Sequence, residues 1–345
     1  MNISRFKAAW ARRKDVAGSL MYWLGVAKGF EVVAQPSGAI ILMYHSVAPD
    51  DLAPEIDPPN RLSPQDFERQ MAFLREHRNV VSMGELVSQL ERGETPPSGT
   101  VCITFDDGYL DNLTTAAPIL EKYDLPATLF LPTSYIDRAE TQWADALHGH
   151  FSRRTVDRLD LQRWGLSVDI GDARQRAAAR RDVHLRLLRA TYAERSELLG
   201  AIEQCLRPVG TTARLTMNWD DVRELAQRFP RFEIGGHSRN HIDLMTHRGD
   251  LAQEEIAGCA QDLRQQLGEG ARHFSFPYGR WCEETRSMVR ASGWRSAVGA
   301  SDRMRIDRAS DRFVLARPAT PSSMTELKFR TSGAYPGVLA MVGLH

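Results

Sequence analysis

Cysteine is scarce in this chain of 345 residues, which contains only four. No two of them form a Cys-x-x-Cys pair, and they are scattered along the sequence at Cys102, Cys205, Cys259 and Cys282. This spacing argues against both a disulfide framework and a zinc ribbon. Cys102 stands within an apolar stretch, so we interpret it as a small buried hydrophobic residue.

The chain also lacks a net charge. Lys plus Arg and Asp plus Glu number 44 each. Overall charge therefore favours neither a nucleic-acid partner nor an acidic one, and we expect no nucleic acid to bind. Hydrophobic residues make up 42% and charged residues 26%, which is ordinary for a soluble globular protein. The length suits one large α/β domain with insertions, or two modest domains.

Long apolar runs are missing as well. Residues 16–27 form an apolar run after a basic stretch, but the run is too short to span a bilayer as a helix. Three interpretations of residues 1–38 stay open: a helix packed on the domain, a helix lying on an anionic membrane surface, or a signal peptide. Tyr, Trp, Gly and Ser within the run, and no clear small-x-small cleavage site after it, make secretion the weaker interpretation. We expect a cytoplasmic protein, with peripheral contact at the cytoplasmic membrane face as an option.

Apolar strand-like runs alternate with amphipathic helical stretches along most of the chain. We predict strands at 39–44, 80–81, 101–106, 127–131, 232–236, 273–276, 296–299 and 313–315. Helices are predicted from Pro64 onward and near 84–92, 113–123, 219–229, 250–267, 283–292 and 322–330. This alternation predicts a parallel sheet, closed or nearly closed as a distorted (β/α) barrel of seven or eight strands within residues 39–345.

Residues 138–214 interrupt the alternation. They are rich in Arg, Ala, Leu and Glu, and they predict a helical insertion without strands. Six arginines make the insertion basic: Arg174, Arg176, Arg180, Arg181, Arg186 and Arg189. They could form a solvated helical face, or a lid or platform that attracts phosphate, an anionic glycan or a membrane.

Two adjacent carboxylates, Asp106 and Asp107, end the strand predicted at 101–106. Burying both is costly unless they are paired, protonated or bound to a metal. Gly108 allows a sharp turn that lets both acids face one cavity. His237 and His241 are four residues apart, the spacing of one helical turn. Asp107 with these histidines would form a two-histidine, one-carboxylate metal site, which leaves Asp106 as a base and indicates a metal-dependent hydrolase.

Three sequence strings carry a resemblance to a known family. TFDDGY at 104–109, HSRNH at 237–241 and RHFSFPYG at 272–279 resemble, in order, signature motifs of the polysaccharide deacetylases. This family is also called carbohydrate esterase family 4 or the NodB homology domain. The resemblance covers about residues 40–330 apart from the insertion. It implies a hydrolase that removes an N-acyl group, most often acetyl, from an amino sugar in a polysaccharide, an oligosaccharide or a lipid-linked glycan.

The resemblance also implies a division of roles between the two acids. Asp106 would be the catalytic base, and a divalent metal ion would be held by Asp107, His237 and His241. Three protein ligands leave positions open, as a catalytic metal requires. Zinc is the expected metal, although two histidines and one carboxylate also suit iron, cobalt or nickel.

Two further roles follow from the resemblance. Arg272 would pair with the base, because a guanidinium can hold a carboxylate through two parallel hydrogen bonds. The backbone N–H of Tyr109 would donate to the oxyanion that forms during hydrolysis, a role that does not involve the tyrosine side chain.

One motif of the family is missing. Many members carry a late Leu-x-x-His motif whose histidine is the general acid, whereas residues 313–318 contain no histidine. His45, in the string Tyr44-His45-Ser46, resembles the start of the exopolysaccharide-type branch, and we consider it as the acid or as a substrate contact. A structural histidine is the alternative. Arg317 could bind an anionic substrate group.

Two other functions remain open. One is a deformylase or amidase that acts on a non-carbohydrate N-acyl substrate. The other is a carbohydrate-binding homologue with weak or no turnover. The intact set of Asp106, Asp107, His237 and His241 argues against loss of catalysis, whereas the missing late histidine argues weakly for it.

Overall fold

The computed structural model describes residues 37–210, 213–268, 271–300 and 305–332. The interpretation of residues 1–38 as a helical, membrane-surface or signal segment therefore falls almost wholly outside the described residues. Within the described ranges, no helix combines the length and the apolar character that a membrane crossing requires.

Seven strands form one parallel sheet, in the order β1-β5-β6-β9-β10-β11-β12. A short eighth strand, β4 (Asn79–Val80), pairs with the first residues of β5. The bounds of the seven are β1 Ala39–Tyr44, β5 Thr100–Asp106, β6 Ala127–Leu131, β9 Phe232–Gly236, β10 His273–Ser275, β11 Ser296–Gly299 and β12 Leu315–Ala316. All their pairings are parallel, so their carboxyl ends meet at one mouth of the sheet.

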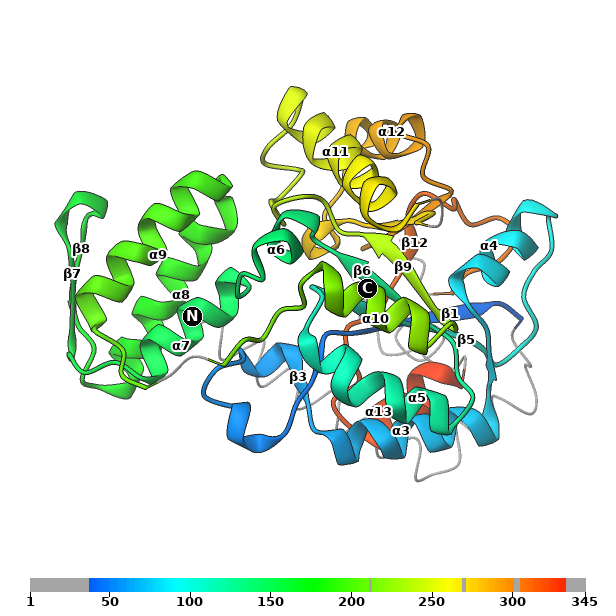
Figure 1. Ribbon diagram of the computed structural model, residues 1–345, viewed down its shortest axis with the longest axis horizontal. Coiled ribbons are helices and arrows are strands. Elements are labelled where there is room, and N and C mark those ends of the chain that lie inside the picture. Colours follow the sequence, from blue (N-terminus) through cyan, green and yellow to red (C-terminus); the bar gives the residue numbers. More distant parts are fainter. Residues whose placement is uncertain (1–36, 211–212, 269–270, 301–304, 333–345) are drawn as a thin grey trace, which may run out of the picture.

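The sheet curls into a nearly closed barrel, as the sequence predicts (Figure 1). Every residue of β5 and β6 is buried, as expected for parallel strands covered on both faces. The outer strands β1 and β12 are not paired with each other among the described residues. Thr320 Oγ1 nevertheless donates to the Met43 carbonyl at 2.7 Å, and Ala39 forms an isolated bridge with Ile306. Loop residues thus cover the gap that a further strand would fill.

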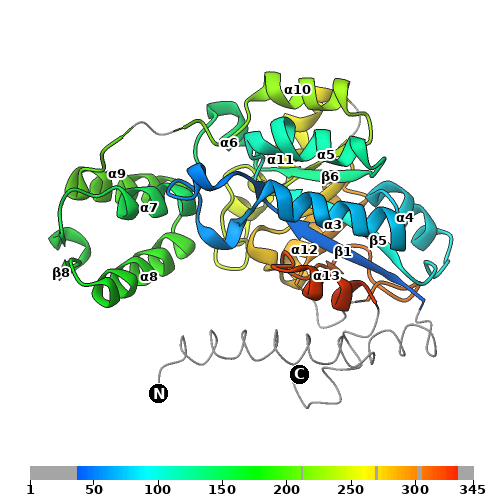
Figure 2. The same cartoon turned by 90° about the horizontal axis from the view of Figure 1, so that it is seen from below.

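Helices surround the sheet (Figures 1 and 2). They are α3 Pro64–His77, α4 Met83–Glu91, α5 Ala117–Lys122, α10 Trp219–Arg228, α11 Asp250–Leu267, α12 Glu283–Ala291 and α13 Met324–Thr331. The start of α3 shows why the sequence folds this way locally. Ser63 Oγ accepts the Asp66 N–H at 3.1 Å, and Pro64 occupies the first helical position, where no N–H is needed. Phe67 and Met71 then face the core.

The insertion is a separate lobe beside the barrel (Figures 1 and 2). Its elements are α7 Trp143–Ser152, β7 Arg158–Leu161, β8 Leu166–Asp169, α8 Ala173–Arg189 and α9 Tyr192–Leu206. The prediction that it contains no strand is wrong, because β7 and β8 form an antiparallel hairpin. Leu159 and Leu161 are buried and alternate with exposed neighbours, but this pattern is too short to stand out in an arginine-rich sequence.

The lobe has its own hydrophobic core, built from Trp143, Leu147, Phe151, Leu159, Leu161, Leu166, Ile170, Ala179, Val183, Leu187, Leu198, Ile202 and Leu206. Part of its basic character is neutralised within the fold. Arg180 Nη1 donates to Asp57 Oδ1 at 2.8 Å, and Arg186 lies 3.3 Å from Asp182. Arg181 and Arg189 are exposed. The basic helix α8 is therefore only partly a solvated face.

Candidate active site

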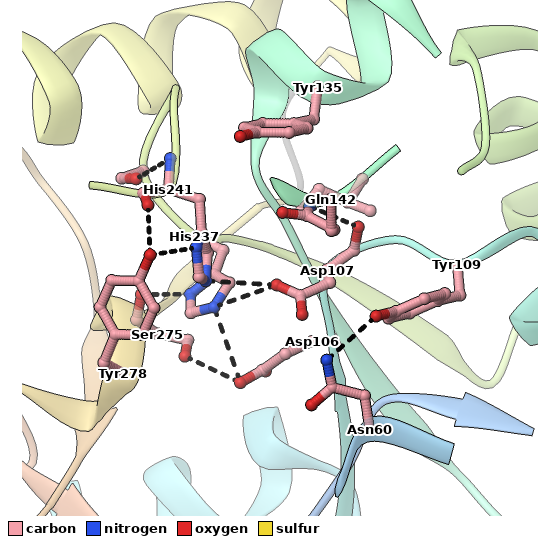
Figure 3. Close-up of polar contacts among 12 residues, drawn as sticks. Asn60, Asp106, Asp107, Tyr109, Tyr135, Gln142, His237, His241, Ser275 and Tyr278 are labelled. Atoms are coloured by element: carbon pink, nitrogen blue, oxygen red, sulfur yellow. Dashed lines mark hydrogen bonds and ion pairs between the residues drawn. The ribbon is translucent and has the colours of Figure 1, made fainter. Parts of the chain in front are cut away.

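The two acids lie where β5 ends and the chain turns. Asp106 is the last residue of β5, and Asp107 and Gly108 have positive φ values of 74° and 69°. A Cβ at Gly108 would lie 2.6 Å from Ile136 Cδ1, so this position requires glycine for space as well as for its φ. The sharp turn directs both carboxylates into the mouth of the barrel (Figure 3).

The two histidines lie on a loop that follows β9, not on a helix as their spacing predicts. Ser238 and His241 have left-handed φ values of 62° and 49°. The loop's N–H groups are satisfied by side chains: Ser238 Oγ accepts from His241, and the Glu255 carboxylate accepts from Arg239 and Asn240. Because these acceptors replace the bonds of a helical turn, the helical expectation is wrong although both imidazoles reach the site.

Asp107, His237 and His241 form one buried group whose potential ligand atoms all lie within 4.8 Å of one another. Asp107 Oδ1 is 3.3 Å from His241 Nε2 and 3.7 Å from His237 Nε2. The same oxygen has no hydrogen-bond donor among the described residues. A buried carboxylate oxygen that faces two imidazoles without a donor is what a cation site requires.

The second nitrogen of each imidazole fixes which tautomer is present. His237 Nδ1 lies 2.7 Å from the Ser275 carbonyl, which can only accept, so Nδ1 must donate. His241 Nδ1 lies 3.1 Å from the Tyr278 hydroxyl, which donates to the His241 carbonyl and is therefore free to accept from Nδ1. Both Nε2 atoms are left with a lone pair directed at Asp107 (Figure 3). The residues present thus fit a divalent metal ion.

Charges around the group agree with this fit. Burial lowers the pKa of His237, and burial together with His237 and Arg195 lowers the pKa of His241 well below its ordinary value. Both imidazoles are therefore neutral, as metal ligands must be. Burial and the nearby Asp106 carboxylate raise the pKa of Asp107 well above its ordinary value. Its ionised form needs a neighbouring cation.

Asp106 is held by an arginine that follows β12, the strand at the other end of the sheet order. Arg317 follows β12 and donates to both oxygens of Asp106, at 2.8 and 2.6 Å. The same guanidinium donates to Thr104 Oγ1 and Ser275 Oγ at 2.9 and 2.7 Å. Burial alone would raise the pKa of Asp106, but Arg317 and His237 hold it well below its ordinary value. Asp106 is therefore ionised.

The prediction that Arg272 pairs with the base is wrong. Arg272 is exposed and precedes β10, so it lies at the amino end of that strand, whereas the site lies at the carboxyl ends. Arg317 makes the paired hydrogen bonds instead. Both Nη groups of Arg317 donate to Asp106, and its Nε is buried, so Arg317 is placed to orient Asp106.

The side chain and the backbone N–H of Tyr109 have different surroundings in the structure. The side chain is buried, and its hydroxyl donates to Asp145 Oδ2 at 2.5 Å and accepts from Asn60 (Figure 3). The bridge between Tyr109 and Thr216 is made by the flanking groups, with the Leu110 N–H donating to Leu215 and the Met217 N–H to Gly108. The Tyr109 N–H takes no part in that bridge. Its role as an oxyanion donor stays a prediction.

His45 lies beside the base. It directly follows β1, and the parallel register that pairs Tyr44 with Phe105 places it opposite Asp106. Its Nδ1 atom is buried without a hydrogen-bond partner among the described residues. Burial lowers the pKa of His45 to about 4, against the opposing effect of Asp106. The imidazole is neutral near pH 7, so a role as general acid requires that it gain a proton during the reaction.

The sequence did not predict the contacts that three residues make at the site. Arg317 carried one signal, its place directly after a strand. Asp145 in α7 binds the Tyr109 hydroxyl, and Arg195 in α9 reaches the His241 carbonyl at 3.1 Å. Neither residue carries a sequence signal, because both come from the inserted lobe and meet the barrel only in three dimensions.

A nearly closed parallel barrel with paired aspartates and two histidines at the carboxyl ends of its strands has the architecture of a barrel hydrolase. The chain belongs to the polysaccharide deacetylase family, whose model matches residues 93–206 and 208–297. Homologues in this family are hydrolases that act on the C–N bonds of N-acetylated sugars. The resemblance seen in the sequence motifs is thereby confirmed.

Two relatives align with part of the chain. The YxkH protein of Bacillus subtilis, which carries the name of a polysaccharide deacetylase, is 32% identical over 134 residues, or 37% of this chain and 46% of that protein. The poly-β-1,6-N-acetyl-D-glucosamine N-deacetylase of Staphylococcus epidermidis is 36% identical over 73 residues, or 21% of this chain and 25% of that protein. The chain thus matches less than half the length of each relative.

Solved structures share the fold over most of the chain. The deacetylase PplD of Streptococcus pyogenes, in complex with acetate, has a TM-score of 0.55 at 19% identity, covering 86% of this chain and 99% of that one. IcaB from Ammonifex degensii has a TM-score of 0.57 at 19% identity, covering 86% and 98%. At these identities the likeness concerns the fold, and it confirms the (β/α) barrel.

Proposed function

We propose that this protein is a metal-dependent N-deacetylase that hydrolyses the N-acetyl group of an amino sugar. The observation that carries the proposal is the pairing of two adjacent sites. The donor set of Asp107, His237 and His241 lies directly beside an ionised Asp106 that Arg317 holds through both oxygens. A cation held by the first group would supply Lewis acidity toward water and toward the acyl carbonyl.

Asp106 serves as the proton acceptor for the attacking water. It is ionised because Arg317 lowers its pKa, and the paired hydrogen bonds fix the plane of its carboxylate. His237 Nε2 lies 3.7 Å from Asp106 Oδ2, and Asp106 is not among the three residues that the metal group comprises, so it borders that group. When this carboxylate takes a proton from water its charge is neutralised, and the hydrogen bonds from Arg317 still hold it in place.

Two other groups act on the substrate. The Tyr109 N–H, which the bridge to Thr216 leaves unused, donates to the acyl oxygen as that oxygen becomes negative. The departing amine must receive a proton, and His45 is the histidine that borders Asp106. Because His45 is neutral before the reaction, it contacts the amide first. It passes a proton to the departing nitrogen only after it receives the proton that Asp106 has taken from water.

The substrate class is an N-acetylated amino sugar within a polysaccharide, an oligosaccharide or a lipid-linked glycan. Family membership supports the sugar, and the name of the Staphylococcus epidermidis relative makes a β-1,6-linked N-acetylglucosamine oligomer the first substrate to test. Zinc is the first metal to test, because two histidines and one carboxylate with open positions form a common catalytic zinc site. Iron, cobalt and nickel suit the same donors.

An acyl-release assay tests this proposal. Chelated protein is reconstituted separately with zinc, iron, cobalt or nickel and is offered β-1,6- and β-1,4-linked N-acetylglucosamine oligomers, a lipid-linked amino sugar, and N-formylated counterparts. We expect acetate release from at least one sugar in a metal-dependent manner. Release from only a non-carbohydrate N-acyl compound would make the protein an amidase or deformylase. Sugar binding without any release would make it a binding protein, and either result would overturn the proposal.

We also propose a cytoplasmic location, with residues 1–38 able to contact the membrane face. The support is the composition of that segment alone, basic residues followed by a short apolar run with Trp and Leu. Fractionation of cells that express the full chain tests it. Recovery of the protein outside the cell would contradict the proposal.

A further inference from the structure

An arginine of the inserted lobe is buried against the loop that carries the metal ligands. Arg195, on α9, is only 1% exposed. Its hydrogen-bond partners among the described residues are all carbonyls and hydroxyls, and the Glu255 carboxylate acts on it only from a longer distance. A buried cation without a counter-ion is costly unless other acceptors satisfy it. The acceptors that Arg195 uses therefore show what this side chain is placed to hold.

Most of the guanidinium's contacts lead to the barrel. Its Nη1 donates to the carbonyls of His241 and Asn240 at 3.1 and 3.3 Å, and Nε donates to the Leu187 carbonyl of α8 at 3.2 Å. The guanidinium carbon lies 5.1 Å from the centre of the Trp143 ring. Arg195 thus spans from the core of the lobe to the backbone of a metal ligand.

Tyr278 makes a second connection between the same partners. Its hydroxyl accepts from Trp143 Nε1 at 2.8 Å and donates to the His241 carbonyl at 3.0 Å. It also lies 3.1 Å from His241 Nδ1 (Figure 3). Arg195 Nη2 donates to the same hydroxyl at 3.5 Å. Both the carbonyl and the imidazole of His241 are therefore held by groups that the lobe anchors.

His241 needs this support because its backbone is strained. Its φ of 49° lies in the left-handed region, which is unfavourable for a non-glycine residue and persists only where the surroundings enforce it. The carbonyl of His241 accepts two hydrogen bonds, one from Arg195 and one from Tyr278. Without the bond from Arg195, only the Tyr278 hydroxyl would hold the carbonyl, and its peptide could rotate more easily toward a relaxed conformation.

We propose that Arg195 is a positioning residue of the metal centre: by holding the His241 carbonyl, it keeps Nε2 of that ligand directed at Asp107. The inserted lobe is then a brace for the site. This inference rests on the proposed function, because it requires that the Asp107, His237 and His241 group binds a metal. Arg195 touches neither the substrate nor the metal itself and acts only through His241.

The test measures metal affinity directly, without substrate. Metal-free wild-type protein and variants compete with a chromophoric chelator for zinc, and the thermal unfolding of each metal-free protein is recorded. We expect Arg195→Met to weaken zinc binding by about 10–100-fold, the range for residues that orient a metal ligand. Arg195→Lys should recover part of the affinity, because an ammonium can reach one carbonyl but lacks the planar fork.

Ile202→Ala is the matched control. Ile202 is fully buried on the same helix and packs in the core of the lobe, so this variant destabilises the lobe without removing a bond to His241. It should lower the melting temperature and leave the zinc affinity unchanged. Equal affinity loss in Ile202→Ala, or wild-type affinity in Arg195→Met, would overturn the inference.

Two further outcomes of the zinc measurement also decide between the possibilities. If Arg195→Met does not fold, Arg195→Lys and Trp143→Phe take its place, since the latter removes the N–H that holds the Tyr278 hydroxyl. Weaker zinc binding in both supports the inference, and unchanged binding in both overturns it. Wild-type protein that binds neither zinc nor iron, cobalt or nickel would overturn the inference together with the metal dependence of the proposed function. Normal binding by all variants would overturn the inference alone.

Discussion

The site has two halves that are built differently. The half with the proposed base uses residues at strand ends: Asp106 closes β5, and Arg317 directly follows β12. The half with the proposed metal ligands uses turns, with positive φ at Asp107 and His241. Ser238 of the same loop accepts the His241 N–H, whereas both donors to the His241 carbonyl come from outside the loop. Strand geometry is sufficient to place the base, whereas the metal ligands depend on neighbours that enforce strained backbone. The two halves should therefore fail in different ways when they are altered.

Removing a metal ligand should have the largest effect. His237→Ala removes an imidazole whose Nε2 lies 3.7 Å from Asp107 Oδ1. We expect this variant to lose turnover and to be purified with less than one zinc ion per chain, because its zinc affinity should fall by more than about 100-fold. Acetate release and metal content of purified protein measure this. His247→Ala is the control, because His247 binds the Arg189 carbonyl away from the site and its removal should spare both readouts. An active His237→Ala protein would refute the metal assignment.

Removing the base should separate the halves. Asp106→Asn keeps the shape of the side chain but cannot accept the proton of water, so kcat should fall by roughly 10²–10⁴-fold. Zinc affinity should change far less, because Asp106 is not one of the three grouped ligands. Steady-state kinetics and chelator competition on the same sample measure the two effects. A parallel fall in zinc affinity would mean that the two acids act as one unit.

Removing the partner of the base should shift the pH profile. Arg317 lowers the pKa of Asp106 against the effect of burial, so Arg317→Met lets that pKa rise and protonates the base over a wider acidic range. The acidic limb of kcat/KM should move to higher pH, and the unpaired buried carboxylate should cost about 3–5 kcal/mol of stability. Arg272→Met is the control and should change neither property, because Arg272 is exposed. A shift of the acidic limb with Arg272→Met instead would mean that Arg272, and not Arg317, pairs with Asp106.

The smallest effect concerns stability where the lobe meets the barrel. Burial raises the pKa of Asp145 to about 7, although the Tyr109 hydroxyl opposes the rise. A raised carboxyl pKa means that the neutral form suits the fold, so this contribution is complete below the unfolded value near pH 4 and is lost as the pH rises through about 7. Asp145→Asn should flatten this slope of stability against pH, which for one titrating group is at most about 1.4 kcal/mol per pH unit. Denaturant unfolding at several pH values measures it, and an unchanged slope contradicts the assignment.

The sequence predicts well whatever depends on local pattern. Strand β1 and helix α11 begin and end where expected, at Ala39–Tyr44 and Asp250–Leu267, because a strand buried on both faces is a short continuous apolar run and an amphipathic helix has a clear periodicity. The residues of the metal half could be predicted for a related reason. Asp107, His237 and His241 stand within short motifs, and the carboxyl ends of parallel strands meet at one mouth.

What the sequence could not predict depends on contacts between distant segments. Arg272 and Arg317 both flank strands, and only the direction of the strand decides which of them reaches Asp106. The spacing of His237 and His241 is compatible with a helix, but Glu255 on α11 offers acceptors that favour a loop. Arg195 resembles the other arginines of the insertion in sequence, and only its burial beside His241 distinguishes it.

A zinc titration of metal-free protein tests the central claim most directly. Acetate release from the best N-acetylated amino-sugar substrate is measured as zinc is added to wild-type protein and to Asp106→Asn. The account predicts that wild-type release rises until about one equivalent of zinc is bound, and that Asp106→Asn binds the same equivalent and releases almost no acetate. Equal release by metal-free and zinc-loaded wild-type protein, or full release by Asp106→Asn, would contradict it.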